Sequence, residues 1–261
     1  MTMRFVRAGI AGLALALLMI AGADEAGAQA GAVQQATLAE SNQKTPEIST
    51  EELRRILSDG SAIVLDSRKA SEYAASHIPG ARNLALRADA SPADSVAAVE
   101  KLLGGDKAKA LVLYCNGLFC QASRRLSEQL VAAGFTSVRR YQLGIPMWRA
   151  LGGVTEIELD GIRRVYNIDR TAVFLDARTA AEFQAGTLPG AGNIPLDAVK
   201  TDGLQKAGGA LLPNDDFNTR VVVFGRDAAQ ARALADAIAQ NARHNVAYFP
   251  GTFDALRMAI R

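Results

Sequence analysis

One stretch of the chain decides the fold, and it reads Leu111-Val-Leu-Tyr-Cys115-Asn-Gly117-Leu-Phe-Cys120-Gln-Ala-Ser123-Arg-Arg-Leu126. The apolar run up to Tyr114 is typical of a buried strand, and the amphipathic pattern from Arg124 to about Ala133 predicts a helix. A glycine-containing loop joins them. The stretch therefore predicts a strand–loop–helix unit, with its loop at the carboxyl end of the strand, where parallel α/β sheets place their ligands.

Cys115 is the candidate nucleophile of this loop. It directly follows the predicted strand, and the unpaired N–H groups and dipole at the start of the next helix favour its thiolate. The alternative is a small apolar cysteine that ends a buried strand. If Cys115 carries an anionic group, we expect the loop to cradle that group through Asn116, Gly117, Leu118, Phe119, Cys120 and Gln121.

The only other cysteine, Cys120, lies in the same loop. An even number of cysteines in an exported chain usually indicates a structural disulfide. However, a bridge that closes only the four residues between Cys115 and Cys120 removes little chain entropy, so redox or sulfur chemistry explains the pair better. Three roles of Cys120 stay open: a resolving thiol that attacks a persulfide or sulfenate on Cys115, a disulfide partner, or a packed side chain.

The N-terminus has the pattern of an export signal. Arg4 and Arg7 precede an uncharged, mostly apolar run over 8–23, and a small-x-small cleavage site follows at Ala28-Gln29-Ala30. This run is shorter than the roughly 20 residues of a spanning helix, although an uncleaved anchor is the alternative. We expect a signal peptide over 1–30, a flexible lead-in over 31–45, a periplasmic or secreted protein, and no stable membrane insertion after cleavage.

The rest of the chain is an internal repeat. Leu65-Asp66-Ser67-Arg68 recurs 110 positions later as Leu175-Asp176-Ala177-Arg178, and the strand 111–114 matches 221–224 at the same offset. We therefore expect two α/β domains, over 46–150 and 155–261, each with a parallel β-sheet flanked by α-helices. Gly225 stands in the second copy where Cys115 stands in the first, so the second copy is expected to lack a nucleophile.

Composition narrows the range of partners. The 29 Lys and Arg against 27 Asp and Glu give a net charge of +2, and the basic residues are scattered rather than interleaved with aromatic residues, so we expect no nucleic-acid partner. The two histidines and two cysteines lack metal-binding spacing, so no metal and no cofactor are expected. Of the histidines, His77 is expected to form structural hydrogen bonds.

Over almost everything after the signal region, the chain resembles a tandem-domain rhodanese-like sulfurtransferase. The motifs that carry the resemblance are Leu65-Asp66-Ser-Arg68, Glu72-Tyr73, His77-Ile-Pro79-Gly80-Ala-Arg-Asn83-Leu84, Tyr114-Cys115 and Tyr141-Gln-Leu-Gly144-Ile-Pro-Met-Trp148. The resemblance implies two rhodanese-like domains, with an active N-terminal copy and a C-terminal copy without the cysteine. It also implies that Cys115 carries a sulfane sulfur as a persulfide. The donor would be thiosulfate, a polysulfide or a persulfide, and the acceptor a small or protein thiol or another nucleophile.

Four residues are expected to support the loop: Asp66, Arg68, Ser123 and Arg124. Asp66 would orient the loop, cap a helix or pair with an arginine, and Arg124 or Arg125 would face the sulfur site. The loop departs from the family's common pattern, because Gly117 comes one residue early and Cys120 stands where an arginine often sits. The sequence from Cys115 to Ser123 has no Lys or Arg, which weakens the prediction of thiosulfate, a dianion, as donor.

Two other functions stay open. A phosphatase or arsenate reductase of the same fold uses a Cys-x5-Arg loop, but Gln121 stands at the arginine position here. A non-enzymatic rhodanese-fold module would use Cys115 and Cys120 as a disulfide or a redox sensor. The sequence favours an exported sulfurtransferase over both.

Overall fold

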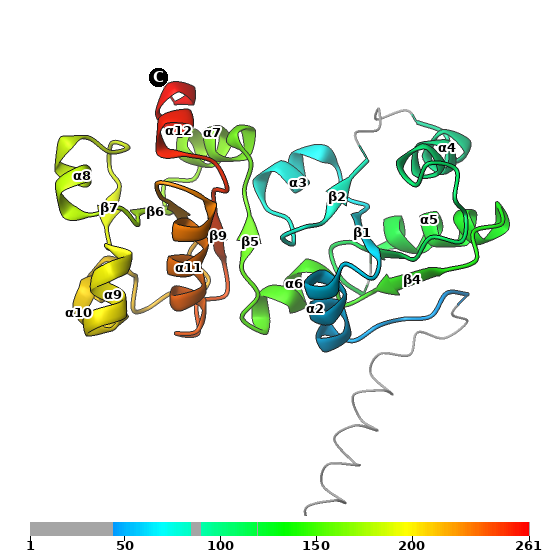
Figure 1. Cartoon of the computed structure of the whole chain (residues 1–261), viewed down its shortest axis with the longest axis horizontal. Coiled ribbons are helices and arrows are strands. Elements are labelled where there is room, and N and C mark those ends of the chain that lie inside the picture. Colours follow the sequence, from blue (N-terminus) through cyan, green and yellow to red (C-terminus); the bar gives the residue numbers. More distant parts are fainter. Residues whose placement is uncertain (1–43, 85–89, 119, 261) are drawn as a thin grey trace, which may run out of the picture. The chain divides into compact units, whose positions relative to one another are not determined.

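The computed structural model describes residues 44–84, 90–118 and 120–260 (Figure 1). These residues form two α/β domains, each with its own parallel sheet, which confirms the predicted fold class. The predicted signal peptide (1–30), most of the predicted lead-in and Phe119 lie outside the described residues. No helix in the described ranges is long and apolar enough to cross a membrane.

The first domain is built on a four-stranded sheet in the order β2-β1-β3-β4, with every pairing parallel. Its strands are β1 (Ile63–Asp66), β2 (Arg82–Asn83), β3 (Leu111–Tyr114) and β4 (Val138–Tyr141). The register places Asp66 opposite Tyr114, and Tyr114 opposite Tyr141. The residues that follow β1, β3 and β4 therefore meet at one edge of the sheet, as expected for parallel strands.

Helices cover both faces of this sheet (Figure 1). They are α2 (Thr50–Asp59), α3 (Ala70–Ala75), α4 (Pro92–Leu102), α5 (Gln121–Ala132) and α6 (Gly144–Ala150). Because successive side chains of a strand point to opposite faces, Leu111 and Leu113 pack in a core with α4 and α5. Val112 and Tyr114 pack on the other face with α2 and α6. The all-apolar run of β3 is thus a strand buried on both sides.

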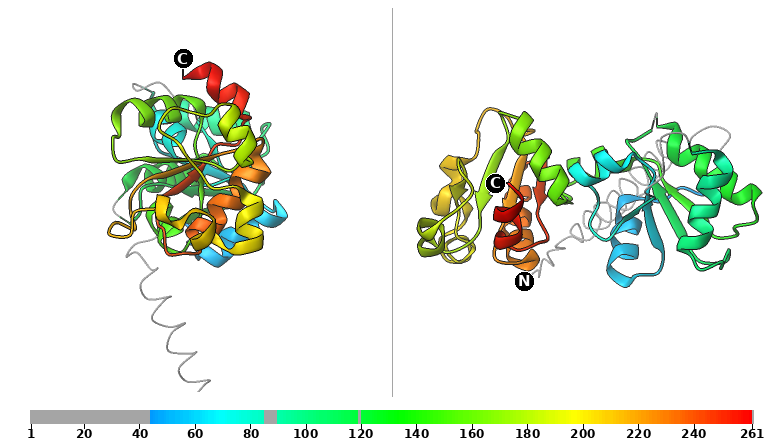
Figure 2. Two further views of the ribbon diagram at one scale, coloured as in Figure 1. Left: turned by 90° about the vertical axis from the view of Figure 1, so that its left-hand side faces the viewer. Right: turned by 90° about the horizontal axis from the view of Figure 1, so that it is seen from above.

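The second domain repeats this plan with a five-stranded parallel sheet in the order β5-β9-β8-β6-β7. Its strands are β5 (Thr155–Glu156), β6 (Val173–Asp176), β7 (Gly192–Asn193), β8 (Val221–Phe224) and β9 (Val246–Tyr248). Its helices are α7 (Leu159–Ile168), α8 (Ala180–Ala185), α9 (Leu196–Asp202), α10 (Leu204–Gly208), the 3-10 turn η1 (Gly209–Leu211), α11 (Ala228–Ala239) and α12 (Phe253–Ala259). Helices α9, α10 and α11 pack on one face and α7 and α12 on the other, as Figure 2 lets the reader follow.

Two local features complete the first domain. Ser49 caps α2, since its side chain accepts a hydrogen bond from the Glu52 N–H at 3.1 Å. Before this cap, the chain runs beside β4: the Ile48 N–H donates to the Arg140 carbonyl, and the Arg140 N–H donates to the Pro46 carbonyl, both at 2.9 Å. This added pairing covers the edge of the sheet beyond β4.

The helix after the cysteine loop starts earlier than predicted. Apolar periodicity placed its start at Arg124, whereas α5 begins at Gln121 with Cys120 as its N-cap. Gln121 and Ala122 are exposed in the first turn, so they add nothing to the apolar pattern from which the start was predicted. The first turn of α5 therefore follows directly on Cys120.

Candidate active site

Cys115 is the first residue after β3, and its backbone is held from both sides. Its carbonyl accepts a hydrogen bond from the Ile145 N–H at the start of α6, at 3.1 Å. The preceding carbonyl, that of Tyr114, accepts from the Ser67 N–H at 3.0 Å and from the Ser67 hydroxyl at 2.6 Å. The side chain of this candidate nucleophile is buried, since the residue is only 1 % exposed. The fold therefore fixes Cys115 at the carboxyl end of the sheet.

The structure joins Cys115 and Cys120 by a disulfide. Between them the chain turns back on itself: the Cys120 N–H donates to the Gly117 carbonyl at 3.0 Å, and Gly117 has a φ of 103°, which favours glycine. Cys120 is only partly exposed, and its side chain makes no capping hydrogen bond to α5 within the described part of the chain. Of the three roles left open for Cys120, the structure therefore depicts the disulfide partner.

Gly144 supports the loop from the neighbouring strand end. It follows β4 with a φ of 62°, and a Cβ atom at this position would collide with the Cys115 carbonyl oxygen and the Gly117 nitrogen. A glycine is therefore required for α6 to approach the cysteine loop this closely. Sequence reasoning noted Gly144 within a motif but gave it no role, because the contact joins residues that are distant in sequence.

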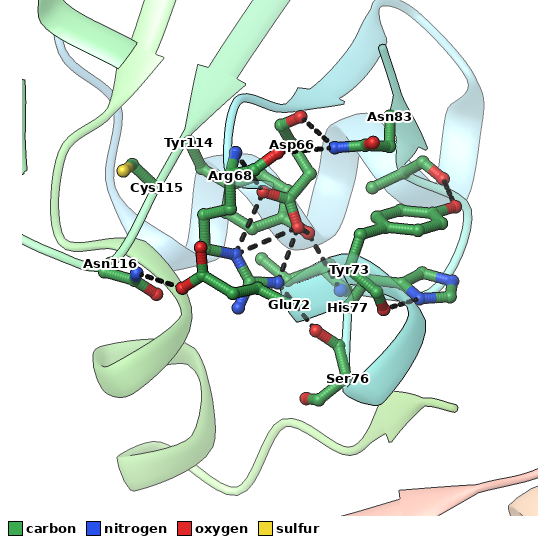
Figure 3. A network of polar contacts seen from close by, with 12 residues as sticks. Asp66, Arg68, Glu72, Tyr73, Ser76, His77, Asn83, Tyr114, Cys115 and Asn116 are labelled. Carbon is green, nitrogen blue, oxygen red and sulfur yellow. Dashed lines mark hydrogen bonds and ion pairs between the residues drawn. The ribbon is translucent and has the colours of Figure 1, made fainter. Parts of the chain in front are cut away.

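A buried ion pair between Asp66 and Arg68 lies in the same region as Cys115 and Asn116, as Figure 3 shows. The Asp66 carboxylate accepts hydrogen bonds from Arg68 Nη2 at 2.6 Å and from the Tyr114 hydroxyl at 2.7 Å. Burial and the Asp66 charge raise the pKa of Tyr114 well above its usual value, so the hydroxyl stays protonated and donates. Burial lowers the pKa of Arg68, but its bonds to Asp66 outweigh this and raise it overall. Of the roles considered for Asp66, the structure shows the pairing with an arginine, Arg68.

The same network reaches the loop through α3. The Asn116 side-chain amide donates to the Glu72 carboxylate at 2.7 Å, and Figure 3 shows Asn116 and Cys115 at the edge of the polar network. The Asn83 amide donates to the backbone carbonyls of Asp66 and Arg68 at 2.8 and 2.9 Å. The side chain of Asn116 is therefore hydrogen-bonded to α3.

The remaining loop candidates are dispersed. Leu118 is 41 % exposed, Gln121 is exposed, and Ser123 is buried on α5 at 1 % exposure. Arg124 lies 3.4 Å from Glu128, one turn further along α5. Phe119 is outside the described residues, and the Cys120 N–H that was expected to join the cradle donates to Gly117 instead.

A cleft of about 900 Å³ opens between the residues that follow β1 and helix α5, and the described residues of the cysteine loop do not line it. Its walls come from the carboxyl end of β1, the starts of α3 and α4, and helix α5, and they include Ser67, Lys69, Ala122, Arg125 and Gln129. Lys69 and Arg125 bring positive charge that the loop sequence itself lacks. Sequence reasoning missed Lys69 and Gln129, although Lys69 follows the Asp66–Arg68 motif at a strand end, a signal that could have found it.

The second copy differs at the matching place. Gly225 follows β8, and a Cβ there would lie 2.9 Å from Gln230 Oε1 and 3.2 Å from the Ala231 nitrogen. The Asp227 carboxylate caps α11 by accepting from the Gln230 N–H at 2.8 Å. Arg226, which matches Asn116, pairs with Glu182 at 2.9 Å and, together with Thr179, holds the pKa of that carboxyl at about 2. The Asp227 carboxylate thus occupies the start of α11, where a bound anion would have to lie.

His77 forms structural hydrogen bonds away from the cysteine loop. Its Nδ1 lies 2.9 Å from the Tyr73 carbonyl and its Nε2 lies 3.1 Å from the Glu156 carboxylate. Burial raises the pKa of Glu156, but hydrogen bonds from His77 and Tyr248 outweigh it and lower that pKa overall. Over the described ranges, no three His, Cys, Asp or Glu side chains are grouped so that they could hold a metal ion.

Comparison with known families identifies the fold. The model of the rhodanese-like domain matches residues 49–151 and again 165–259, so the chain belongs to the rhodanese-like family and contains two copies of its domain. The two matches agree with the repeat in the sequence and with the two sheets of the structure. A search of curated protein sequences finds no significant match.

Several solved structures are similar to the chain. A thiosulfate sulfurtransferase from Pseudomonas aeruginosa is 23% identical over 81% of this chain, with a TM-score of 0.35, and the chain spans only 44% of that protein. A 3-mercaptopyruvate sulfotransferase from Escherichia coli is 22% identical over 80% of this chain and 99% of its own length, with a TM-score of 0.36. A rhodanese-like domain from Anabaena is 26% identical over 44% of this chain and 80% of its own, with a TM-score of 0.35.

Proposed function

We propose that the protein is an exported sulfurtransferase that moves a sulfane sulfur through a persulfide on Cys115. The observation that carries this proposal is the position of Cys115 in a rhodanese-like domain: it follows β3 at the carboxyl edge of the sheet, in a loop that leads directly into the start of α5. The helix start favours the thiolate and its persulfide, because both are anions.

The reaction has two displacement steps. In the first, the reduced Cys115 thiolate attacks the sulfane sulfur of the donor and the donor's sulfur–sulfur bond breaks. Sulfite, a shorter polysulfide or a thiolate leaves with the electron pair, according to the donor. In the second, an acceptor thiolate attacks the outer sulfur of the Cys115 persulfide and releases the Cys115 thiolate. The disulfide of the structure must be reduced before the first step, because its sulfur is no longer a nucleophile.

The cleft between the end of β1 and helix α5 supports an anionic donor. Lys69 and Arg125 line it, and positive groups in a cleft attract anions and raise their local concentration. This supports thiosulfate or a polysulfide as donor more strongly than the loop sequence does, since the loop from Cys115 to Ser123 contributes no cation. We assign no cofactor or metal to the reaction.

The test is a sulfur-transfer assay on reduced protein, with thiosulfate or polysulfide as donor and a small thiol as acceptor. Transfer that depends on the protein supports the proposal. A second candidate, the redox-sensing or binding module, is favoured by the disulfide between Cys115 and Cys120. It is supported instead if the reduced protein transfers no sulfur and its two cysteines only cycle between thiols and disulfide. Phosphatase or arsenate reductase activity is not proposed, because Gln121 replaces the arginine it needs.

The second copy is proposed to be inactive, and Gly225→Cys is expected to give no sulfur transfer when Cys115 is replaced by serine. A new side chain at Gly225 meets Gln230 and Ala231, and Asp227 already caps α11. The rate of the Cys115→Ser, Gly225→Cys double variant is expected to equal that of Cys115→Ser alone. A persulfide found on residue 225 of the double variant would contradict this division of labour.

Export is proposed from the N-terminal pattern. Exported protein is expected to begin at or near Gly31, or at Gln29 if cleavage follows Ala26-Gly27-Ala28. N-terminal sequencing of the periplasmic or secreted fraction measures this directly. Full-length chain retained in the cytoplasm is the contrary result, and full-length chain in the membrane fraction would indicate an uncleaved anchor.

A further inference from the structure

The cysteine loop brings its two sulfurs together without rearranging the domain. The Cα atoms of Cys115 and Cys120 are 6.1 Å apart, within the range of about 4.4–6.8 Å that disulfides require. The turn closed by the Cys120 N–H and the Gly117 carbonyl sets this separation. Gly144 holds the first half of the loop against α6. A thiol at Cys120 is therefore within reach of any sulfur group built on Cys115 Sγ.

The two cysteine residues differ in exposure. Cys115 is 1 % exposed at the end of a strand buried on both faces. Cys120 is partly exposed at the N-cap of α5. An attacking thiol from another molecule therefore reaches Cys120 first, whereas Cys120 reaches Cys115 from inside the loop.

We propose that Cys120 is the internal acceptor of the persulfide, so that the protein releases its sulfur as hydrosulfide; this rests on the proposed persulfide of Cys115. The Cys120 thiol gives its proton to the outer sulfur of the persulfide anion and attacks Sγ of Cys115 as a thiolate; the bond between Sγ and the outer sulfur breaks, and the outer sulfur leaves with the electron pair as HS⁻. The Cys115–Cys120 disulfide forms in the same step. The sulfane sulfur is reduced to sulfide, and the two cysteines supply the two electrons.

An external dithiol completes the cycle. Its first thiolate attacks Sγ of Cys120, the more exposed of the two residues, and Cys115 leaves as a thiolate at the start of α5. Its second thiol then attacks the mixed disulfide and frees Cys120, which leaves the partner oxidised to its own disulfide. The structure therefore corresponds to the state after sulfide release, and the partner is a dithiol reductant, either a small dithiol or an exported dithiol protein.

The test follows the fate of sulfur already bound to the protein. Reduced protein is loaded with polysulfide, desalted without air, and followed by intact mass and by assay of released sulfide. The parent chain is expected to lose its persulfide, release sulfide and end about 2 Da below the dithiol mass as the disulfide forms. Cys120→Ser and Cys120→Ala are expected to keep the persulfide at least about tenfold longer and to release no sulfide until a thiol is added.

The outcomes separate this inference from the proposed function. Equal persulfide lifetimes in the parent and both Cys120 variants, without disulfide or sulfide, overturn the role of Cys120 while sulfur transfer through Cys115 stands. The absence of any persulfide on Cys115 in all of these chains overturns the proposed function itself. Cys115→Ser, which retains Cys120 as its only thiol, is the control for sulfur bound at the wrong cysteine.

Discussion

Cys115→Ser is expected to lower the rate of sulfur transfer by at least about a thousandfold, because the persulfide has no other nucleophile on which to form. Serine is nearly isosteric with cysteine, so the buried position at the end of β3 keeps its packing and its backbone bond to Ile145. The hydroxyl is a much weaker nucleophile than the thiolate. The measurement is the transfer rate of reduced protein with a saturating donor.

The control is the thermal unfolding of reduced parent and reduced Cys115→Ser. Reduction opens the disulfide of the parent, and Cys115→Ser cannot form one, so the comparison isolates the change of sulfur to oxygen. The midpoints are expected to be similar. A variant that remains folded and still transfers sulfur at the parent's rate would show that Cys115 is not the nucleophile.

Asp66→Ala is expected to destabilise the first domain by about 3–5 kcal/mol, the usual cost of leaving a buried charge without its partner. The Arg68 side chain is 5% exposed, and the substitution removes the carboxylate to which it donates at 2.6 Å. The Tyr114 hydroxyl loses its acceptor at the same time. Trp148 is the only tryptophan and lies in the core of this domain, so its fluorescence during urea unfolding measures this free energy.

Glu100→Ala is the matched control for Asp66→Ala. It also removes a carboxylate from an ion pair in the first domain, but Glu100 and its partner Lys107 are 43% and 38% exposed. Because exposed pairs contribute little, the free energy of unfolding is expected to change by no more than about 0.5 kcal/mol. Equal losses in Asp66→Ala and Glu100→Ala would refute the structural role given to the buried pair.

Much of the fold could be predicted because its signals repeat. The strand 111–114 and its match at 221–224 are apolar at every position and bounded on both sides, and the structure confirms both sets of bounds. The offset of 110 positions predicted two domains of one design, which the two parallel sheets confirm. The burial of the strand 111–114 also followed from the sequence, because its side chains are of the types most often found inside proteins.

The parts of the site that the sequence did not reveal depend on contacts between distant segments. Gly144 approaches Cys115 from the end of β4, and Lys69 and Arg125 line one cleft from the start of α3 and from α5. Neither the spacing of motifs nor the composition predicts these contacts between segments that are distant in sequence. Asp66 shows the same limit: its position at a strand end was evident, but the choice between capping and pairing depended on where Arg68 and Tyr114 point.

The cysteine loop is an intermediate case. Its position between strand and helix could be predicted, and the short interval between Cys115 and Cys120 made a bridge geometrically conceivable. The turn through Gly117 that brings Cys120 back toward Cys115 could not be predicted from the sequence. It depends on the left-handed conformation of Gly117 and on the start of α5 at Gln121. Apolar periodicity predicts neither the conformation of Gly117 nor the first residue of α5.

The central claim is that Cys115 carries the transferred sulfur, and peptide-level mass spectrometry of Cys120→Ser after sulfur loading tests it most directly. This variant has only one cysteine, so no disulfide can form within the chain and a persulfide can form at only one site. After reduction, loading with thiosulfate or polysulfide and trapping with an alkylating agent, the account predicts one added sulfur, about 32 Da, on the peptide that contains Cys115. A folded, reduced chain in which that peptide carries no added sulfur with either donor would contradict the account.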